Sequence, residues 1–354
     1  MNRKKEILTE ILIPVFAVLV SLIFCDILIL IYKESPYRVY RMLIEGTLLN
    51  PYGIGQVLFK TTPLIFSGLA VAFAFRTGLF NIGGEGQLYM GAFATGLIGV
   101  YLPAGTPPLV AVSLCMAGGF FAGAAVGFVP GYLKAKLGSH EVINTIMLNF
   151  IVMALINYLI VRYFKVPETL HTREIIGNAH LARLSRYFPA FGGSAVNLSF
   201  FISILACVAV YIILWKTKYG YEIRAVGLNP GAAETAGINV RNSIITAMCV
   251  SGGLAGLIGI NYVLGYKYYF EEGFSSGLGF MGIAVALLGR NHPLGIVLAA
   301  LLFGMLSQGG LVINAVVPKE LVDILQAIVI ICVVSSNYEV RRILSRAAGR
   351  TEKK

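Results

Sequence analysis

The feature that most limits how this chain can fold is a set of long apolar stretches without formal charge. Five stretches hold no Asp, Glu, Lys or Arg: 87–133, 197–215, 243–262, 273–289 and 293–318. A helix that crosses a bilayer needs about 20 mostly apolar residues. Charged residues make up only 13% of the chain, about half the share usual in a soluble domain. Too little polar surface therefore exists to cover these stretches in water, and the sequence predicts an integral membrane protein.

Helix is the expected structure of the apolar stretches, because backbone amides in lipid must find their partners within the segment. We predict an all-α, polytopic membrane protein with about ten transmembrane helices in one domain over 11–337. The expected spans are 11–32, 56–75, 87–102, 108–133, 142–162, 198–215, 243–262, 278–290, 294–313 and 321–337. The first is too long for the core of a signal peptide and lacks a cleavage site, so we expect a retained helix.

Lys and Arg residues set the expected orientation, since cytoplasmic loops are enriched in both. This rule places residues 1–10, the loop 216–242 and the basic tail 338–354 in the cytoplasm. Segment 163–196 is then extracytoplasmic in spite of its basic residues, because long translocated segments follow the rule poorly. The net charge of +11 is accounted for by topology and anionic lipid headgroups, without any nucleic-acid partner.

Two glycine-rich segments interrupt the apolar pattern. Residues 76–87 read RTGLFNIGGEGQ, and residues 271–282 read EEGFSSGLGFMG. Irregular backbone at membrane depth is tolerated where it is buried in protein or lines a water-filled cavity, and paired interruptions often mark the pathway of a transporter. We therefore predict discontinuous helices near 76–87 and 271–282, with ordinary interfacial loops as the alternative.

Small residues spaced four apart predict close helix packing. Gly119, Gly123, Gly127 and Gly131 form one such row, and Gly252 and Gly256 form another. Glycines at this spacing let two helix backbones approach each other. The partner of each row could lie in this chain or in a second one.

A polar row runs along the predicted span 142–162. Glu141, Thr145, Asn149 and Asn157 lie four or eight residues apart, so one stripe of the helix is expected to face the bundle interior. Its amide and hydroxyl groups suit a neutral solute in a pathway, and they suit hydrogen bonds between helices equally well.

The loop 216–242 contains the signals of a short helix. Asn229 can cap the first turn, Pro230 fits the first helical position, and Gly237 can end the helix after residues 231–236. A small helix of this kind on a cytoplasmic loop is a surface that the groove of a partner can hold.

Three motifs give this chain a specific family resemblance. The loop carries the pattern Tyr221-x-x-Arg224-Ala225-Val226-Gly227-x-Asn229-x-x-Ala232-Ala233-x-x-x-Gly237-Ile238-x-Val240; the other two motifs are Phe80-Asn81-Ile82-Gly83-Gly84-Glu85-Gly86-Gln87 and Phe280-x-Gly282-Ile283-Ala284-Val285-Ala286-Leu287-Leu288-Gly289. Together they resemble the ABC-importer permeases for simple sugars, branched-chain amino acids and nucleosides, over about residues 50–340. The stretch 139–149, SHEVINTIMLN, is similar to the nucleoside (guanosine and purine nucleoside) branch.

The resemblance implies a transport subunit, not an enzyme, in the cell membrane of a bacterium, with both termini cytoplasmic. The expected partners are a cytoplasmic ABC ATPase, a second and different permease, an extracytoplasmic substrate-binding lipoprotein and membrane lipid. This chain has no G-x-x-x-x-G-K-[ST] motif, so ATP and Mg²⁺ are expected on the ATPase and no cofactor on this chain.

The resemblance and the polar pattern also assign residues to roles. The residues expected to couple to the ATPase are Tyr221, Arg224, Asn229, Pro230, Ala232, Ala233 and Gly237. The residues expected along the solute pathway are Asn81, Glu85, Gln87, Asn144, Thr145, Asn149 and Phe280. Interhelical hydrogen bonding and packing are the structural alternatives for the second set.

Other functions remain open from the sequence. The same machinery could import a simple sugar or a branched-chain amino acid, and a stand-alone channel or ion-coupled carrier would leave the loop 216–242 unexplained. A membrane enzyme is disfavoured because no nucleophile–base–acid group and no metal-ligand spacing occurs in the sequence. We therefore expect no catalytic residues and no metal site.

Overall fold

The computed structural model describes residues 19–314, 316–318, 322–324, 326–328 and 330–331. In these ranges every regular element is a helix, and the only β-type pairing consists of isolated bridges. The all-α prediction is therefore confirmed for the described residues. The predicted N-terminal segment 1–10, the tail 338–354, residues 11–18 of span 11–32 and most of span 321–337 lie outside them.

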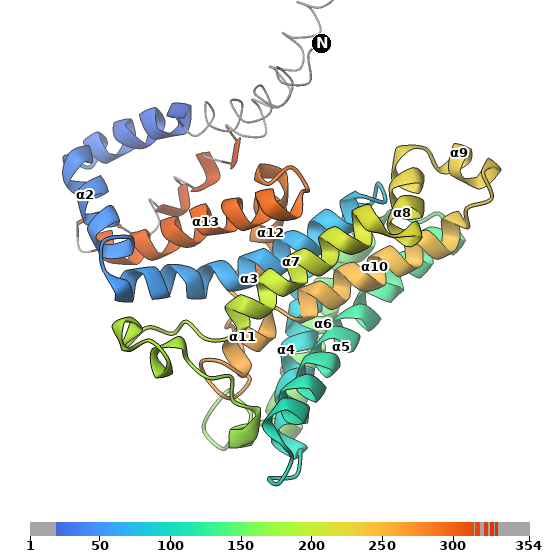
Figure 1. Cartoon of the computed structure of the whole chain (residues 1–354), viewed down its shortest axis with the longest axis horizontal. Coiled ribbons are helices and arrows are strands. Elements are labelled where there is room, and N and C mark those ends of the chain that lie inside the picture. Colours follow the sequence, from blue (N-terminus) through green and yellow to red (C-terminus); the bar gives the residue numbers. More distant parts are fainter. Residues whose placement is uncertain (1–18, 315, 319–321, 325, 329, 332–354) are drawn as a thin grey trace, which may run out of the picture. The chain divides into compact units, whose positions relative to one another are not determined.

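Most helices follow one another with short connections, and the longer connections lie between α6 and α7 and between α11 and α12 (Figure 1). They are α2 Pro36–Thr47, α3 Pro51–Phe75, α4 Gly84–Tyr101, α5 Pro108–Leu137, α6 Glu141–Leu159, α7 Ser199–Lys216, α8 Lys218–Leu228, α9 Pro230–Thr235, α10 Val240–Gly256, α11 Gly259–Val263, α12 Leu278–Leu288 and α13 Pro293–Ile313. A π-helical turn, Ile160–Phe164, continues α6, and 3-10 turns occur at Gly177–Ala179, Leu184–Arg186 and Pro189–Phe191.

Six helices among the described residues are long and apolar enough to cross a membrane: Pro51–Phe75, Pro108–Leu137, Glu141–Phe164, Ser199–Lys216, Val240–Val263 and Pro293–Ile313. Two other predicted spans form helices that are less suited to crossing a membrane. Helix α4 carries Glu85 and Gln87 among its glycines, and α12 has only 11 residues. Helix formation is thus confirmed at these positions, whereas the number of crossings is not fixed by length and composition.

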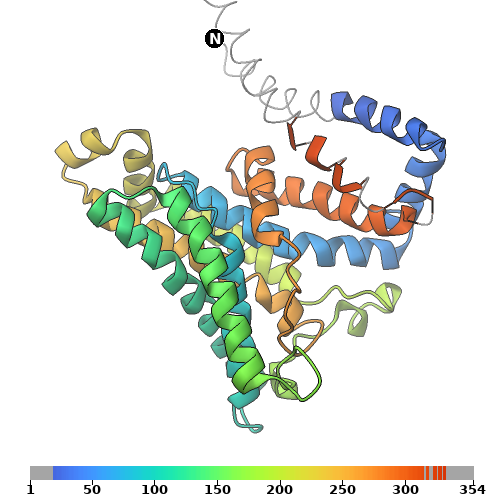
Figure 2. The same cartoon turned by 180° about the vertical axis from the view of Figure 1, so that it is seen from behind.

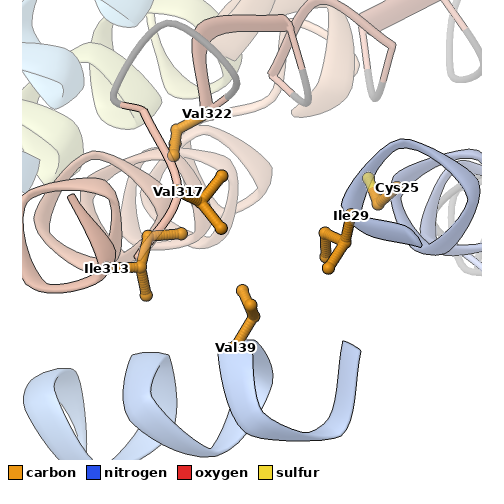
Figure 3. Close-up of a cluster of buried hydrophobic side chains, with 6 residues drawn as sticks. All are labelled: Cys25, Ile29, Val39, Ile313, Val317 and Val322. Atoms are coloured by element: carbon orange, nitrogen blue, oxygen red, sulfur yellow. The ribbon is translucent and has the colours of Figure 1, made fainter. Parts of the chain in front are cut away.

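The chain divides into two compact units, one formed by residues 1–53 and 305–354 and the other by 54–304. In the first unit, α2 packs on the C-terminal end of α13 through apolar side chains. Cys25, Ile29, Val39, Ile313, Val317 and Val322 form the buried cluster (Figure 3). Helix α2 was not predicted from the sequence, because its polar face carries Arg38, Arg41 and Glu45 and interrupts the apolar pattern.

In the second unit, α5 and α10 pack along their glycine rows (Figure 2). A Cβ atom on Gly123 would come within 2.3 Å of the Gly252 carbonyl oxygen, and one on Gly256 would come within 2.2 Å of the Gly119 carbonyl oxygen. Helix α4 joins the same contact, since a Cβ atom on Gly91 would come within 2.3 Å of the Gly256 Cα atom. The predicted glycine packing is confirmed, and the partner helix belongs to this chain.

The two glycine-rich segments are only partly irregular. Helix α3 ends at Phe75 and α4 begins at Gly84, and α12 begins at Leu278. The ranges 84–87 and 278–282, predicted as irregular, are therefore helical. Both are the first turns of helices whose glycines pack against other backbones, Gly279 against Glu85 for example, and this packing offsets the poor helix propensity of glycine.

Candidate transport and coupling sites

The loop between α3 and α4 is held by a buried hydrogen-bond network centred on Asn81. Its side-chain amide nitrogen donates to Gln87 Oε1 at 2.9 Å and to Ser251 Oγ of α10 at 2.8 Å. Its Oδ1 accepts from the Gly83 backbone at 2.9 Å. Asn81 and Gln87 are at most 1% exposed. Every polar atom of Asn81 is thus used to fix the loop and join it to α10.

Helix α6 holds the same loop from another side. Asn149 Oδ1 accepts from the Gly86 amide at 2.8 Å, and its Nδ2 donates to the Ile82 carbonyl at 3.0 Å. Thr145 Oγ1 accepts from the Ile82 amide at 3.3 Å. Both side chains are buried. Two members of the predicted polar row therefore face the interior and pair with backbone groups of the loop and of the first turn of α4.

The row itself was predicted too long. Thr145 and Asn149 are buried, but Asn157 is exposed. The cause is geometric, because residues four apart on a helix with 3.6 residues per turn rotate by about 40° at each step. Between Thr145 and Asn157 the accumulated rotation is about 120°, which turns Asn157 off the interior stripe.

Glu85 connects the two glycine-rich segments. Its carboxylate accepts hydrogen bonds from Ser275 Oγ, from the Gly277 amide at 3.3 Å and from the Gly279 amide at 2.8 Å. The side chain is only 5% exposed. A buried carboxylate is tolerated when several donors satisfy it. The first turn of α4 is thus tied to the first turn of α12.

The remaining pathway residues lie outside this network. The amide group of Asn144 donates to Ser139 Oγ at 2.7 Å, and Phe280 is 46% exposed. Sequence reasoning missed Ser251 and Ser275, which complete the network. Ser251 could have been noticed as a hydroxyl inside the uncharged stretch 243–262.

Helices α8 and α9 form an arm at one end of the 54–304 unit, which we call the α8–α9 arm (Figure 1). Asn229 caps α9, since its Oδ1 accepts from the Ala232 amide at 3.1 Å. Pro230 occupies the first position of the helix, and Gly237 follows the end with φ of +83°. The predicted short helix is confirmed, while α8 is an addition to a stretch that was predicted as a loop.

The α8–α9 arm exposes one side and anchors the other. Leu228 is 89% exposed, and Ala232 and Tyr221 are also exposed. Ile223, Val226 and Ala233 are buried. The two adjacent alanines predicted to couple to the ATPase therefore differ in exposure. The side chain of Ala232 is accessible at the surface, whereas that of Ala233 is buried.

The arm borders a basic cavity at the end of α3. The cavity has a volume of about 530 Å³ and is lined by Phe75, Arg76, Tyr221, Arg224, Ala225, Gly227 and Leu228. The guanidinium group of Arg76 donates to the Asn291 carbonyl at 2.8 Å and lies 4.9 Å from the centre of the Trp215 ring. Burial, and then the neighbouring Arg224, hold the pKa of Arg76 below its usual value.

Comparison with known protein families identifies the family of this chain. The family described as "Branched-chain amino acid transport system / permease component" matches residues 53–334. The chain belongs to this family. The match covers α4, α6, α10 and α12 with their shared network, as well as the α8–α9 arm. The chain is thus a multi-pass membrane permease component.

Several relatives match nearly the whole permease. The guanosine ABC transporter permease NupP of Bacillus subtilis is 39% identical, over 96% of this chain and 97% of its own. The nucleoside ABC transporter permease NupB of Lactococcus lactis is 37% identical over 93% and 91%. The glucose ABC transporter permease TsgB13 of Haloferax volcanii is 33% identical over 92% and 87%. A second permease of Bacillus subtilis, the guanosine ABC transporter permease NupQ, is 30% identical, and a second permease of Lactococcus lactis, the nucleoside ABC transporter permease NupC, is 28% identical.

Proposed function

We propose that this permease forms half of the membrane pathway of an ABC importer for nucleosides. The observation that carries the proposal is the exposed side of the α8–α9 arm. Leu228 is exposed and lines the cavity of Arg76 and Arg224, and Ala232 is exposed on α9. The names of NupP and NupB support a nucleoside as the solute. The paired relatives NupP and NupQ, and NupB and NupC, support a second, different permease as the partner.

The other subunits follow from the chemistry that this permease lacks. A cytoplasmic ATPase would hold ATP and Mg²⁺ and grip the α8–α9 arm, and an extracytoplasmic lipoprotein would deliver the solute. The topology that we propose has about ten crossings, with the α8–α9 arm and both termini in the cytoplasm and segment 163–196 outside. Nucleotide-driven movement of the arm would then shift the pathway between outward-open and inward-open states.

The proposed pathway residues fall into two groups by burial. Phe280 and Asn144 are accessible and can contact a solute in this conformation. Asn81, Glu85, Gln87, Thr145 and Asn149 are buried and hydrogen-bonded within the chain. We propose that the buried group borders the pathway and transmits movement from one glycine-rich segment to the other.

The test is a charge at the exposed alanine. Ala232→Asp is expected to leave folding and membrane insertion intact, because the side chain points away from the protein, and to reduce ATP-dependent nucleoside uptake at least tenfold. Glu234→Gln, at another exposed position of α9, is the matched control and is expected to retain uptake. Normal uptake by Ala232→Asp at normal expression would contradict the proposal.

A sugar is the second candidate solute, because TsgB13 is named as a glucose permease. Competition separates the two solutes. Excess unlabelled nucleoside should abolish labelled nucleoside uptake while excess glucose has no effect, and the reverse pattern would assign the permease to sugars. Uptake that persists without ATP would instead indicate a stand-alone channel or carrier.

A further inference from the structure

A second cavity lies on the exposed side of α6, away from the network and the α8–α9 arm. Its volume is about 630 Å³, and it is lined by Met153, Ala154, Asn157, Tyr158, Val161, Arg162 and Glu272. Six of these residues come from the spanning segment Glu141–Phe164, and Glu272 comes from the loop before α12. The volume is sufficient for a small organic solute.

The polar groups of this cavity are unusual for their position. The exposed side of α6 is otherwise apolar and includes Met147, Phe150, Ile151 and Leu155. Asn157 lies on the same spanning segment, is exposed, and donates a hydrogen bond to the Glu272 carboxylate. Polar and ionisable groups within a span face a cavity or another helix in preference to lipid, because lipid cannot hydrogen-bond them. The Asn157–Glu272 pair is therefore expected to face this cavity and not lipid.

The pair has the chemistry to recognise vicinal hydroxyl groups. A carboxylate has about four acceptor sites, and one amide donor leaves the others for a ligand. Carboxylates bind ribose hydroxyls in this way in dinucleotide-binding proteins. The ring of Tyr158 is 57% exposed at the same cavity and offers an aromatic surface for a base.

Glu272 belongs to the same loop before α12 as the hydrogen-bond donors Ser275 and Gly277 of the buried network. The next residue, Gly273, donates its backbone amide to Tyr89 Oη at 2.9 Å. Ser275 and Gly277, a few residues further on, donate to Glu85. A ligand held by Glu272 would therefore contact the segment that joins α12 to α4.

We propose that Asn157 and Glu272 form a solute subsite that binds the ribose 2′,3′-diol of a nucleoside, with Tyr158 beside the base. This inference rests on the proposed nucleoside function and adds the recognition site within the permease. The subsite selects ribonucleosides over analogues without the diol, and it adds to whatever selection a binding protein makes.

The experiment uses the complete transporter in proteoliposomes, with the binding protein and each solute at saturating concentration. Maximal uptake rates are compared for tritiated guanosine and 2′,3′-dideoxyguanosine. The wild-type transporter is expected to prefer guanosine by about tenfold, the effect of roughly one hydrogen bond to a charged group. Glu272→Gln and Asn157→Leu are expected to lower the guanosine rate to that of the dideoxy compound.

The matched control is Glu271→Gln, because Glu271 is the neighbouring carboxylate and is paired with Lys267 at 3.1 Å. It should keep the tenfold preference. A Glu272→Gln transporter that retains the preference for guanosine would contradict the proposed subsite. An equal fall in the uptake rates of guanosine and the dideoxy compound would also contradict it, and would indicate a docking or structural role for Glu272. If Glu272→Gln lowers the yield of folded protein, Asn157→Leu gives the same readout. Wild-type transporter without any nucleoside uptake would refute the proposed function as well.

Discussion

The loop at residues 76–83 and the α8–α9 arm are built from similar residues, but their asparagines have opposite roles. Both combine glycines with asparagines. In the loop, Asn81 is buried and hydrogen-bonds to Gln87 and Ser251. In the arm, Asn229 is exposed and caps a helix whose outer side is not covered by any of the described residues. The comparison teaches that burial, not residue type, separates the internal framework from the surface that we propose for a partner.

The framework depends on glycine contacts, so the largest effect is expected from Gly123→Leu. The new side chain would push α5 from α10 where a Cβ atom already meets the Gly252 oxygen at 2.3 Å. Overpacking costs about 3 kcal/mol at the upper end of the usual range, and we expect most of the protein to be lost from the membrane fraction. The measurement is the folded yield by size-exclusion chromatography in detergent.

Gly105→Ala is the control, because no atom lies within 4 Å of a Cβ at that position. Its yield should equal that of the wild type. Equal yields for Gly123→Leu and Gly105→Ala would show that the glycine contact does not hold the framework together.

A smaller effect is expected from Glu85→Ala, which removes the acceptor for Ser275, Gly277 and Gly279. Hydrogen bonds to charged groups contribute about 1.5–3 kcal/mol, so a loss of about 2 kcal/mol in the free energy of unfolding is expected. It should appear as a lower melting temperature in detergent. Glu45→Ala, which removes only an exposed pair with Arg41, should change stability by less than about 1 kcal/mol. Equal melting temperatures for the two variants would show that Glu85 does not stabilise the framework.

The smallest effect is expected in the arm. Asn229→Ala removes the cap of α9 and should cost about 1 kcal/mol locally, with no change in the melting temperature of the whole protein. Hydrogen exchange of the backbone amides of α9 would measure the loss. Asn229→Asp should preserve protection, since aspartate caps equally well. A global loss of stability in Asn229→Ala would make the arm part of the framework.

Local signals in the sequence predicted the parts of the structure that depend on neighbouring residues. The uncharged stretches predicted the positions of the helices, and Asn229 with Pro230 predicted α9. The glycine rows predicted close helix packing, but the structure was needed to identify the partners as α5 and α10. The pairing of Glu85 with Ser275 could not be predicted, because it joins residues 190 positions apart. No periodicity in one segment contains that information.

The candidate site shows the same division. The interior position of Thr145 and Asn149 followed from the polar row, but the exposure of Asn157 did not, because the four-residue spacing drifts around the helix. Likewise, the same role was predicted for Ala232 and Ala233. The structure shows that the packing of the α8–α9 arm buries Ala233 and leaves Ala232 exposed.

The most direct test of the account is site-specific photo-cross-linking in the complex purified from its native host. A photoreactive amino acid replaces Leu228, which is 89% exposed on the arm, or Leu109, which is 81% exposed at the start of α5. We predict a cross-link to the ATPase subunit from position 228 and none from position 109. A cross-link to the ATPase from position 109, or none from position 228 in a transporter that still takes up solute, would contradict the claim that the arm receives the force of ATP binding.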